Sequence, residues 1–503
     1  MGNRILFFLT NDYTHYCLAH AMQKKDKSEL FAISEVTSRP KKFFETQKLV
    51  NFEKIWFFHE QIKNSKFQID FEYLANFEKK YKINLWKLLQ NVRIFLYFKN
   101  FHKFTYHEIL NIVEQECRFF EKILGEVKPD YFFTRLPSLH HQELIYDMCK
   151  NTNVKVVAMN YTLLGKKSMI SQEQGRLDYV TDLEQLDHQN RDFNDLQQYI
   201  KSFDLLQQID DKLVKQTGGG REKISSLKEY LFNFDFENTK THYTYYGRNR
   251  RKVLSYYLKD VIKRKTRKKF VDKKLKMKIG DQTRFVYFPL HIEMERSLLL
   301  GAPYYVNQTE VIRNVAKSLP IDYKLYVKEH PGNVLRSWRS KEEYEQIMEI
   351  PNVVLFHPDF SKEELYKKCT MVFSIAGTAG FEASCYGKPA ITLVDVNYSI
   401  LPSVKVLRNF DELPGLFNEL SNLKVNPTHV DQFLTLFENN ISNFDWSDFS
   451  KKMHDKFFAG SIQDAIISEK DMKEFLEENN DMIENFADEH IKKMNWFANG
   501  NNR

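Results

Sequence analysis

The feature that most constrains the fold is an alternation of short apolar runs and amphipathic stretches between residues 284 and 394. Apolar runs bounded by polar turns are typical of buried strands, and the stretches between them repeat apolar residues at helical spacing. Strands are expected at 284–288, 324–328, 353–356, 371–375 and 390–394, and helices at 307–318, 338–349, 361–368 and 379–386. Strands that alternate with helices form a parallel sheet with right-handed crossovers, so this region is predicted to be an α/β domain.

A similar but less regular alternation occupies the start of the chain. Strands are expected at 4–10, 54–59, 130–134 and 155–159, and helical periodicity covers 70–125 and 139–150. Two α/β domains in one chain usually hold a ligand in the cleft between them. Open parallel sheets bind that ligand outside the carboxyl ends of their strands.

The chain is predicted to divide into four parts, because 503 residues exceed what one hydrophobic core of about 250–300 residues can organise. Residues 1–180 are expected to form an N-terminal Rossmann-like domain, and residues 281–427 a C-terminal Rossmann-like domain. Residues 181–280 are interpreted as a helical, basic insertion or linker, interrupted by Thr217-Gly-Gly-Gly-Arg221. Residues 428–503 are expected to be helices that pack back on the N-terminal domain.

The positive charge of the chain is concentrated in residues 248–278. This segment holds 15 Lys or Arg and two acids, a net +13, so the rest of the chain carries −6 of the total of +7. A solvated helical face and a surface that contacts anionic lipid are both compatible with such clustering. Nucleic-acid binding is expected least, because the nearby tyrosines could stack bases but no known nucleic-acid module is recognisable.

Cysteine usage and apolar run length indicate a reducing compartment and no membrane span. The five cysteines lack a C-x-x-C pair and are expected to be reduced and buried: Cys17, Cys117, Cys149, Cys369 and Cys385. No apolar run approaches the roughly 20 residues that a spanning helix needs. The protein is therefore expected in the cytoplasm, with the inner face of the cell membrane as a peripheral partner of the basic segment.

The first motif with chemical content is Val327-Lys-Glu-His-Pro331, at the carboxyl end of a predicted strand. Proline after histidine ends the strand and restricts the backbone of His330, which holds the imidazole at the ligand edge of the sheet. There it can donate a hydrogen bond to a phosphate oxygen. The alternative is a capped strand end with a satisfied histidine.

The second motif is Ser374-Ile-Ala-Gly-Thr-Ala-Gly-Phe-Glu382, followed by Gly387-Lys-Pro389. Small residues after a strand let the backbone approach an anion, and the N-terminus of the next helix presents free N–H groups. Thr378 adds a hydroxyl, and Glu382 lies one turn further on, where it could accept hydrogen bonds from a ribose. The spacing fits neither a Walker A loop nor a Rossmann G-x-G-x-x-G motif, and a tight turn that needs glycine for packing is the alternative.

The third motif, Phe288-Pro-Leu-His-Ile-Glu-Met-Glu-Arg296, follows the first strand of the second domain. It places His291, Glu293, Glu295 and Arg296 near the expected cleft, where an arginine could bind phosphate or a carboxylated sugar. A charged loop is the alternative interpretation.

These motifs occur together in one known family. Pro-Leu-His is followed in order by Glu295, Gln308, Lys328-Glu-His-Pro331, Gly377-Thr-Ala-Gly-Phe-Glu-Ala383 and Gly387-Lys-Pro389. Residues 284–410 thus resemble the bacterial capsule polysaccharide biosynthesis glycosyltransferases, which include capsular Kdo transferases. The first 180 residues resemble the family loosely, through strand order and Leu139-His-His141. The resemblance implies the GT-B fold, two Rossmann-like domains facing across a cleft, and transfer without a metal ion. It also implies that residues 1–180 form the acceptor domain and residues 281–427 the nucleotide-sugar-binding domain.

The resemblance also implies a set of donor-binding residues. His330 and Thr378 would hold the donor phosphate, and Gly377 and Gly380 would shape the turn. The full set is His291, Glu295, Arg296, Lys328, His330, Pro331, Gly377, Thr378, Ala379, Gly380 and Glu382. The chain departs from the family at Met294, where proline is frequent, and at Gly377-Thr378, where paired serines occur.

A general base is expected from the first domain, across the cleft, at a strand end. Asp12 and His15, after the first strand, are the predicted catalytic residues. His59, His140 and His141 are alternatives, and for each of the five an ordinary loop role stays open. The trio Asp235-Phe-Glu237 lies in the polar insertion and is interpreted as solvated, so neither a catalytic metal nor a cofactor is expected.

The combined prediction is a glycosyltransferase that moves a sugar from a CMP- or UDP-linked donor to a surface polysaccharide or glycolipid acceptor. Three alternatives remain open: transfer of a polyol phosphate from a CDP-polyol, a 2-epimerase acting on UDP-N-acetyl sugars, and a basic scaffold that binds membrane or RNA without catalysis.

Overall fold

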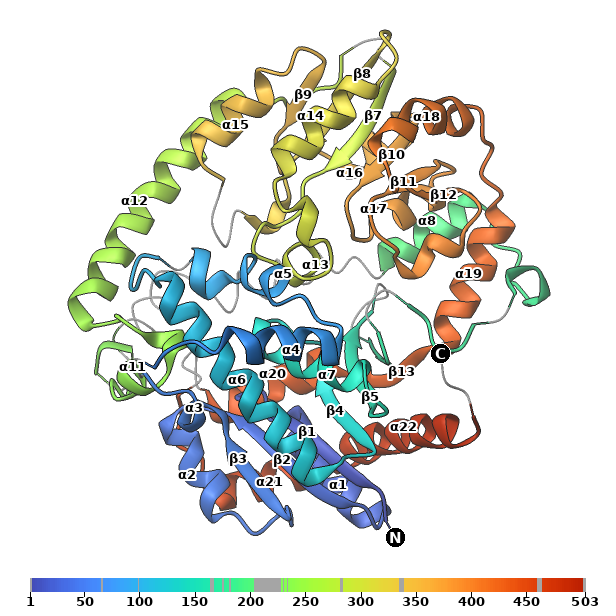
Figure 1. Ribbon diagram of the computed structural model, residues 1–503. Coiled ribbons are helices and arrows are strands. Elements are labelled where there is room, and N and C mark those ends of the chain that lie inside the picture. The colour runs from blue at the N-terminus through green and yellow to red at the C-terminus, as the bar shows by residue number, and fades with distance from the viewer. Residues whose placement is uncertain are drawn as a thin grey trace.

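The computed structural model of the protein contains two α/β units, one above the other in Figure 1. It describes residues 2–500 except 65–66, 98, 163–166, 174–175, 181, 203–227, 229, 233, 281–283, 334–338 and 459–463. The glycine-rich stretch 217–221 lies outside the described residues.

The first unit is built on a seven-stranded sheet with the order β13-β6-β5-β4-β1-β2-β3 in the described chain. Its strands are β1 (Arg4–Thr10), β2 (Glu29–Glu35), β3 (Lys54–Phe57), β4 (Tyr131–Arg135), β5 (Lys155–Tyr161), β6 (Lys167–Ser171) and β13 (Ile441–Asp445). β1 to β5 are parallel, and their order 3-2-1-4-5 reverses between β1 and β4. Such a reversal marks the ligand edge of a Rossmann-like sheet.

Both faces of this sheet are buried, as in other parallel sheets. In β1, Ile5, Phe7 and Leu9 point to one apolar cluster and Leu6 and Phe8 to the other, each at most 3% exposed. The helices of this part are α1 (Thr14–Lys25), α2 (Ser38–Thr46), α3 (Phe58–Gln61), α4 (Phe71–Tyr81), α5 (Leu85–Leu89), the π-helix η1 (Arg93–Tyr97), α6 (Tyr106–Val127) and α7 (His140–Lys150). α6 begins at a capping box in which Thr105 and Glu108 each bond the other's backbone N–H.

The second unit is built on a six-stranded sheet with the order β12-β11-β10-β7-β8-β9, parallel throughout. Its strands are β7 (Arg284–Pro289), β8 (Tyr323–Lys328), β9 (Val353–Phe356), β10 (Met371–Ser374), β11 (Ala390–Thr392) and β12 (Val404–Val406). Its helices are α13 (Arg296–Leu299), η4 (Pro303–Tyr305), α14 (Gln308–Ser318), η5 (Pro331–Asn333), α15 (Lys341–Met348), α16 (Lys362–Lys368), α17 (Ala379–Cys385), η6 (Asn397–Ile400), η7 (Phe410–Glu412), α18 (Leu413–Ser421) and α19 (Pro427–Asn439). This is the doubly wound order 3-2-1-4-5-6, with its switch point between β7 and β10.

The end of the chain returns to the first unit. β13 pairs antiparallel with β6, and α20 (Trp446–Phe457), α21 (Glu469–Glu478) and α22 (Asn480–Ala498) pack in the same apolar cluster as Ile5 and Phe7. β13 corrects the expectation of an entirely helical tail. Its buried Ser442 and Phe444 alternate with exposed or half-buried neighbours, which is the period of a strand with one covered face.

The segment between the units crosses the outside of the molecule (Figure 1). η2 (Leu183–Gln185) and α8 (Phe193–Ser202) pack on the second unit, where Leu183 and Leu196 join the cluster of Phe285 and Phe381. α11 (Asn238–Thr241), η3 (Tyr243–Tyr245) and the 25-residue α12 (Arg250–Lys274) follow. None of the helices in the described part of the chain has the length and apolar character that crossing a bilayer demands.

Two parallel-sheet, Rossmann-like units confirm the predicted α/β, GT-B-like fold class. All five cysteines are buried and free. The sequence prediction missed β2, whose apolar residues were not recognised as the second strand, so 54–57 is the third strand. The periodicity over 70–125 is divided into α4, α5, η1 and α6.

Replacing Phe486 by alanine is expected to lower the free energy of unfolding by about 3–5 kcal/mol, because a buried ring is lost and a cavity remains. Phe486 is 1% exposed and stacks on Phe444 with 4.0 Å between ring centroids. Urea unfolding followed by fluorescence measures the change. Phe71→Ala, at a side chain 58% exposed, is the matched control and should change it by less than about 1 kcal/mol. Equal effects of both substitutions would contradict the packing of the tail described here.

Candidate functional site

A cavity of about 760 Å³ lies at the carboxyl ends of β7, β8 and β10, at the switch point of the second sheet. The loops after these strands form most of its wall, and Ile200 and Lys201 of α8 close one side. Nine of the eleven predicted donor-binding residues line it: His291, Glu295, Lys328, His330, Pro331, Gly377, Thr378, Ala379 and Glu382.

His291 joins the loops that follow β7 and β10. Its Nε2 accepts a hydrogen bond from the backbone N–H of Ala376 at 3.2 Å. Burial, with smaller effects of His330 and Arg339, lowers the pKa of His291 to about 3, so the imidazole is neutral. Gly377 has a φ of +136°, a backbone conformation that favours glycine, and a Cβ there would also lie only 3.2 Å from His291 Nε2.

Gln308 fixes the backbone of His291 from the other side. Its side-chain oxygen accepts from the N–H of His291 at 2.7 Å, and its side-chain nitrogen donates to the carbonyl of His291 at 3.0 Å. Gln308 is 2% exposed at the start of α14. Gln308 is part of the motif order on which the family resemblance rests. In the structure its two hydrogen bonds position the backbone of His291.

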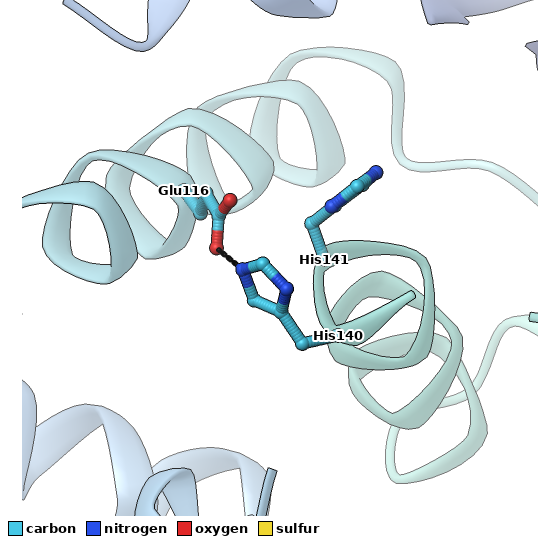
Figure 2. Close-up of side chains that lie close together, drawn as sticks. All are labelled: Glu116, His140 and His141. Atoms are coloured by element: carbon cyan, nitrogen blue, oxygen red, sulfur yellow. Dashed lines mark ion pairs between the residues drawn. The ribbon is translucent and has the colours of Figure 1, made fainter. Parts of the chain in front are cut away.

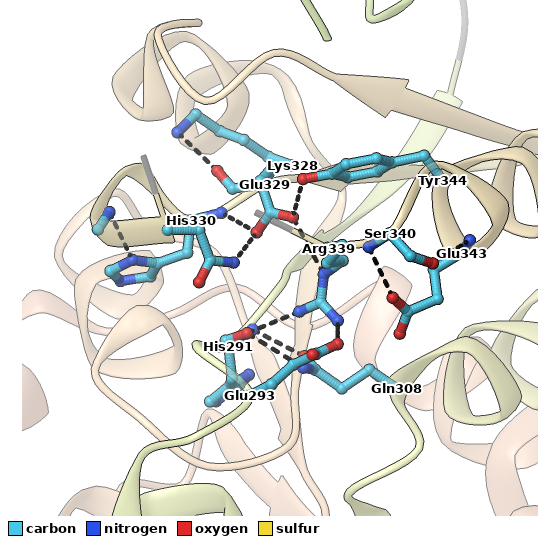
Figure 3. A network of polar contacts seen from close by, with 12 residues as sticks. His291, Glu293, Gln308, Lys328, Glu329, His330, Arg339, Ser340, Glu343 and Tyr344 are labelled. Carbon is cyan, nitrogen blue, oxygen red and sulfur yellow. Dashed lines mark hydrogen bonds and ion pairs between the residues drawn. The ribbon is translucent and has the colours of Figure 1, made fainter. Parts of the chain in front are cut away.

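Glu329 is the centre of a buried polar network between β8 and α15 (Figure 3). Its carboxylate accepts hydrogen bonds from the N–H of His330 at 2.6 Å, Asn333 Nδ2 at 2.7 Å, Arg339 Nε at 3.0 Å and the Tyr344 hydroxyl at 2.8 Å. Glu329 is 0% exposed. Four donors satisfy a carboxylate that would be costly to bury alone, and they fix the His-Pro turn.

Arg339 links this network to the loop after β7. Its Nη2 donates to the carbonyl of His291 at 2.7 Å, and its Nη1 pairs with the Glu293 carboxylate. The Arg339 side chain is 2% exposed. Sequence reasoning missed Arg339 because no motif surrounds it, and its partners come from two other segments, the loop after β7 and the end of β8.

His330 presents its imidazole to the cavity. Its Nδ1 accepts a hydrogen bond from the backbone N–H of Gly332 at 3.0 Å. This pattern places the proton of the neutral ring on Nε2, which can donate to an anionic oxygen.

Thr378 and Glu382 form a pair at the start of α17. The Thr378 hydroxyl donates to Glu382 Oε1 at 2.7 Å, and Lys362 Nζ lies 3.2 Å from Glu382 Oε2. The predicted spacing of one helical turn therefore brings these two side chains together at the cavity wall.

Lys328 lines the cavity with a buried side chain that is held by a backbone carbonyl. Its Nζ donates to the carbonyl of Pro358 at 2.7 Å, and the side chain is buried. Burial lowers the pKa of Lys328 to about 8. The amine thus holds the end of β8 to the chain that follows β9, and the residue lines the cavity from that position.

Two predicted donor residues lie outside the cavity wall. Gly380 packs against Tyr398, whose ring atoms would lie 2.9 Å from an added Cβ. Arg296 crosses to the first unit, where its Nη2 donates to both carboxylate oxygens of Glu143 at 3.1 and 2.8 Å. Both side chains of this ion pair are at most 13% exposed. Because α13 follows β7 and α7 follows β4, this pair shows that the carboxyl ends of the two sheets face each other.

Asp12 lies at the switch point of the first sheet, directly after β1. It pairs with Arg135 at the end of β4 and accepts hydrogen bonds from the N–H and hydroxyl of Thr14. Burial opposes ionisation, but Arg135 and Thr14 together lower the pKa of Asp12 below its ordinary value. The Asp12 side chain is 16% exposed.

The histidines predicted as bases are more deeply placed. His15 is 3% exposed in the first turn of α1, and burial lowers its pKa to about 4. His59 is 8% exposed, and its ring lies 3.9 Å from that of His242. His140 and His141 are at most 1% exposed. Of the five predicted bases, Asp12 has the most accessible side chain.

The fold is that of a GT-B-like protein, with a cavity at the switch point of its second Rossmann-like unit. Residues 187–401 match the family model described as "Capsule polysaccharide biosynthesis protein". This match confirms the family resemblance over that part of the chain. No curated protein matches the chain.

Solved structures with a similar arrangement include epimerases and transferases. A UDP-GlcNAc 2-epimerase from Methanocaldococcus jannaschii, in complex with UDP-GlcNAc and UDP, has 12% identity, coverage of 87% of this chain and 99% of its own, and a TM-score of 0.26. MnaA from S. aureus, in a co-structure with UDP, has 11% identity, coverage of 92% and 98%, and a TM-score of 0.25. KpsC from Thermosulfurimonas dismutans, a beta Kdo 2,7 transferase, has 11% identity, coverage of 63% and 79%, and a TM-score of 0.31.

Replacing Arg339 by methionine is expected to lower the free energy of unfolding by about 3–5 kcal/mol, because Glu329 and Glu293 lose their buried cation. Urea unfolding measures the loss. Arg284→Met is the matched control, since Arg284 pairs with Asp322 on the surface at 3.2 Å, and its loss should stay below about 1 kcal/mol. A similarly small loss for Arg339→Met would rule out the network as the support of the cavity.

Asp147 of α7 makes stability depend on pH. Burial and the nearby Glu143 carboxylate raise the pKa of Asp147 to about 7. Between the ordinary pKa and about 7 the folded chain binds more protons than the unfolded chain, so this contribution to stability falls as pH rises through that window. Asp147→Asn should therefore raise Tm more at about pH 8 than at about pH 5. Thermal unfolding at both values tests this, with the exposed Asp481→Asn as control, and a pH-independent difference would contradict it.

Proposed function

We propose that this protein is a glycosyltransferase that moves a sugar from a CMP- or UDP-linked donor to a surface polysaccharide or glycolipid acceptor. The observation that carries the proposal is the cavity at the second switch point, where His330, Thr378 and the turn from Gly377 meet. Its volume of about 760 Å³ suits a nucleotide-sugar, since small-molecule sites usually measure about 300–1,000 Å³. The family match over 187–401 supports a role in capsule synthesis.

The donor phosphate is proposed to bind between His330 and the Gly377–Ala379 turn. His330 offers its Nε2 proton, and the first N–H groups of α17 have no acceptor within the helix. Negative charge grows on this phosphate as its bond to the sugar breaks. Donors fixed beforehand by Glu329 and His291 would stabilise that charge without reorganising during the reaction.

Asp12 is the proposed general base. In the transfer, the acceptor hydroxyl oxygen bonds to the anomeric carbon, the bond from that carbon to the phosphate oxygen breaks, and the hydroxyl proton passes to the Asp12 carboxylate. The lowered pKa keeps Asp12 ionised at neutral pH, as a base requires. The contact between Arg296 and Glu143 supports this assignment, because it shows that the two strand-end edges face each other.

The proposed transfer uses no catalytic metal. Among the described residues, the side chains gathered closely enough to hold a metal ion are Glu116, His140 and His141, in the first unit and away from the donor cavity. His330 and the backbone N–H groups supply the positive potential instead. Added Mg²⁺ or Mn²⁺ should therefore leave the rate of transfer unchanged.

Nucleotide binding is the first test of this function. A cytidine or uridine nucleotide should raise Tm, and His330→Ala should abolish that shift because the phosphate loses a fixed donor. Thermal shift with CMP, CDP, UMP and UDP measures it, and His107→Ala, at an exposed position of α6, should keep the shift. Absence of any shift in the unaltered protein would defeat the enzyme proposals.

The choice among enzyme reactions follows from the donor that is consumed. Intact CMP-sugar, UDP-sugar and CDP-glycerol should be compared, with released nucleotide and product measured separately. Sugar transfer supports the proposal. Transfer of a polyol phosphate, or formation of an epimer of a UDP-N-acetyl sugar, would replace it by one of the two other reactions.

We also propose that α12 brings the protein to an anionic membrane that carries the acceptor. Four aliphatic side chains, Leu254, Leu258, Val261 and Ile262, follow helical spacing on one face and are 40–65% exposed. Lys265, Lys268 and Lys269 continue the same face toward the end of the helix. Aliphatic groups that can enter a bilayer beside lysines that attract anionic lipid favour a membrane over a nucleic acid, whose phosphates would use the lysines alone.

Membrane binding is tested with phosphatidylglycerol–phosphatidylcholine vesicles in a sedimentation assay. The double variant Leu258→Asp, Ile262→Asp should bind at least about tenfold less, because two apolar contacts become charges. Ile321→Asp, at a fully exposed position of the second unit, is the matched control and should bind normally. A dimer in light scattering that the double variant abolishes, with vesicle binding unchanged, would assign the face to a second copy instead.

A further inference from the structure

A second cluster of chemically active side chains lies in the first unit, where α6, α7 and η3 meet. Ligand atoms of Glu116, His140 and His141 all lie within 4.8 Å of one another, as Figure 2 shows for the side chains. The Tyr243 hydroxyl joins them, 2.9 Å from Glu116 Oε1 and 2.8 Å from His141 Nδ1. All four residues are at most 1% exposed.

The hydrogen bonds within the described residues do not satisfy this cluster. Neither ring nitrogen of His140 makes a hydrogen bond, although its Nε2 lies 3.1 Å from Glu116 Oε2. A nitrogen and a carboxylate oxygen this close, without hydrogen-bond geometry, have the separation of two ligands on one ion. Buried polar atoms without partners are rare in folded proteins and point to a group that completes them.

The charge of Glu116 leads to the same conclusion. Its carboxylate is 0% exposed, and among the described residues its ion-pair partner is His140, with no lysine or arginine in contact. A buried carboxylate is costly unless a cation or a metal ion compensates it.

Glu35 lies beside His141, in the place where a carboxylate is commonly found behind a metal-bound histidine. His141 Nε2 lies 3.0 Å from Glu35 Oε1, without hydrogen-bond geometry in this structure, and Gln142 Nε2 donates to Glu35 Oε2 at 2.7 Å. Metal-bound histidines commonly donate their second ring N–H to a carboxylate, which fixes the tautomer and the ring orientation. His141 Nδ1 is thereby left facing Glu116 and Tyr243.

We propose that Glu116, His140, His141 and the Tyr243 oxygen bind one divalent transition-metal ion of the Zn²⁺ class. Two imidazoles and a carboxylate are donors that such ions prefer, and four protein ligands suit a closed, tetrahedral site. Aromatic rings pack against the two histidines. The ring centroids of Phe58 and His141 are 4.5 Å apart, and those of Phe95 and His140 are 4.9 Å apart.

The role of this site is structural. Three ligands come from α6 and α7 of the first unit, and Tyr243 comes from the segment that leads into α12. The ion fastens the connection between the two units to the first one. It lies outside the donor cavity, so it takes no part in the proposed sugar transfer.

The experiment measures metal content and stability of the full chain purified in the presence of Zn²⁺. Mass spectrometry of the metal should find one ion per chain, and a chelator should lower Tm. Glu116→Gln and Tyr243→Phe keep the shape of the side chains, and each should lower bound zinc at least tenfold. His107→Ala, an exposed histidine on the same helix as Glu116, should keep the full metal content.

Cobalt replacement gives an independent readout. The Co²⁺-loaded protein should show the strong visible absorption of a tetrahedral site, and Glu116→Gln should abolish it. Substoichiometric metal in the unaltered protein, or full metal content in both Glu116→Gln and Tyr243→Phe, would overturn the site. The nucleotide-dependent Tm shift should persist in the metal-depleted variants, so failure of the donor site and failure of the metal site give different results.

Discussion

The cavity of the second unit depends on one buried ion pair, between Glu329 and Arg339. Glu329 fixes the backbone of His330, while Arg339 holds the carbonyl of His291 and the Glu293 carboxylate. Loops after two neighbouring strands thus become one rigid body. Burying either charge alone would cost free energy of desolvation, and the hydrogen-bond donors around Glu329 compensate most of that cost. The remaining cost is consistent with a site whose groups must stay in place before any ligand arrives.

The two units contribute to the proposed reaction in different ways. The second unit holds its cavity with a network inside one sheet, whereas the first presents Asp12, paired with Arg135, at the corresponding switch point. Arg296 and Glu143 connect the two edges directly. Because the proposed donor and base lie on separate units, the distance between the sheets decides whether transfer can occur. The ion pair between Arg296 and Glu143 would therefore set the geometry of the proposed reaction as well as that of the interface.

Much of the second unit follows from its sequence, and less of the first does. Five of the six strands of the second sheet are apolar runs bounded by turns, and His330 and Thr378 lie in the turns after two of them, so local pattern was sufficient there. The three-residue β12 was not predicted. β13 is a short edge strand and β6 is the short strand beside it. Both carry polar residues, and their pairing joins Ser168 to Ser442, far apart in sequence. Local pattern carries little information on such a pairing.

Arg339 and the cluster around Glu116 were missed for a related reason. Their partners come from several elements, and the contacts exist only after the fold has formed. Arg296 shows the converse: its position near the cleft was predicted, but Glu143, on the other unit, determines where its guanidinium points. Residue type and strand position predicted which side chains lie near the cavity. Tertiary contacts determine which of them face it.

The return of the chain to its first unit has a consequence for synthesis. β13 and the three helices after it cover the face of the sheet that carries Ile5 and Phe7, yet they leave the ribosome after the whole second unit. The second unit is complete once α19 has emerged, so the half that is made first finishes folding second. Until then a broad apolar surface near the N-terminus stays open to chaperones and to aggregation, and messages truncated before residue 441 would yield chains that never cover it.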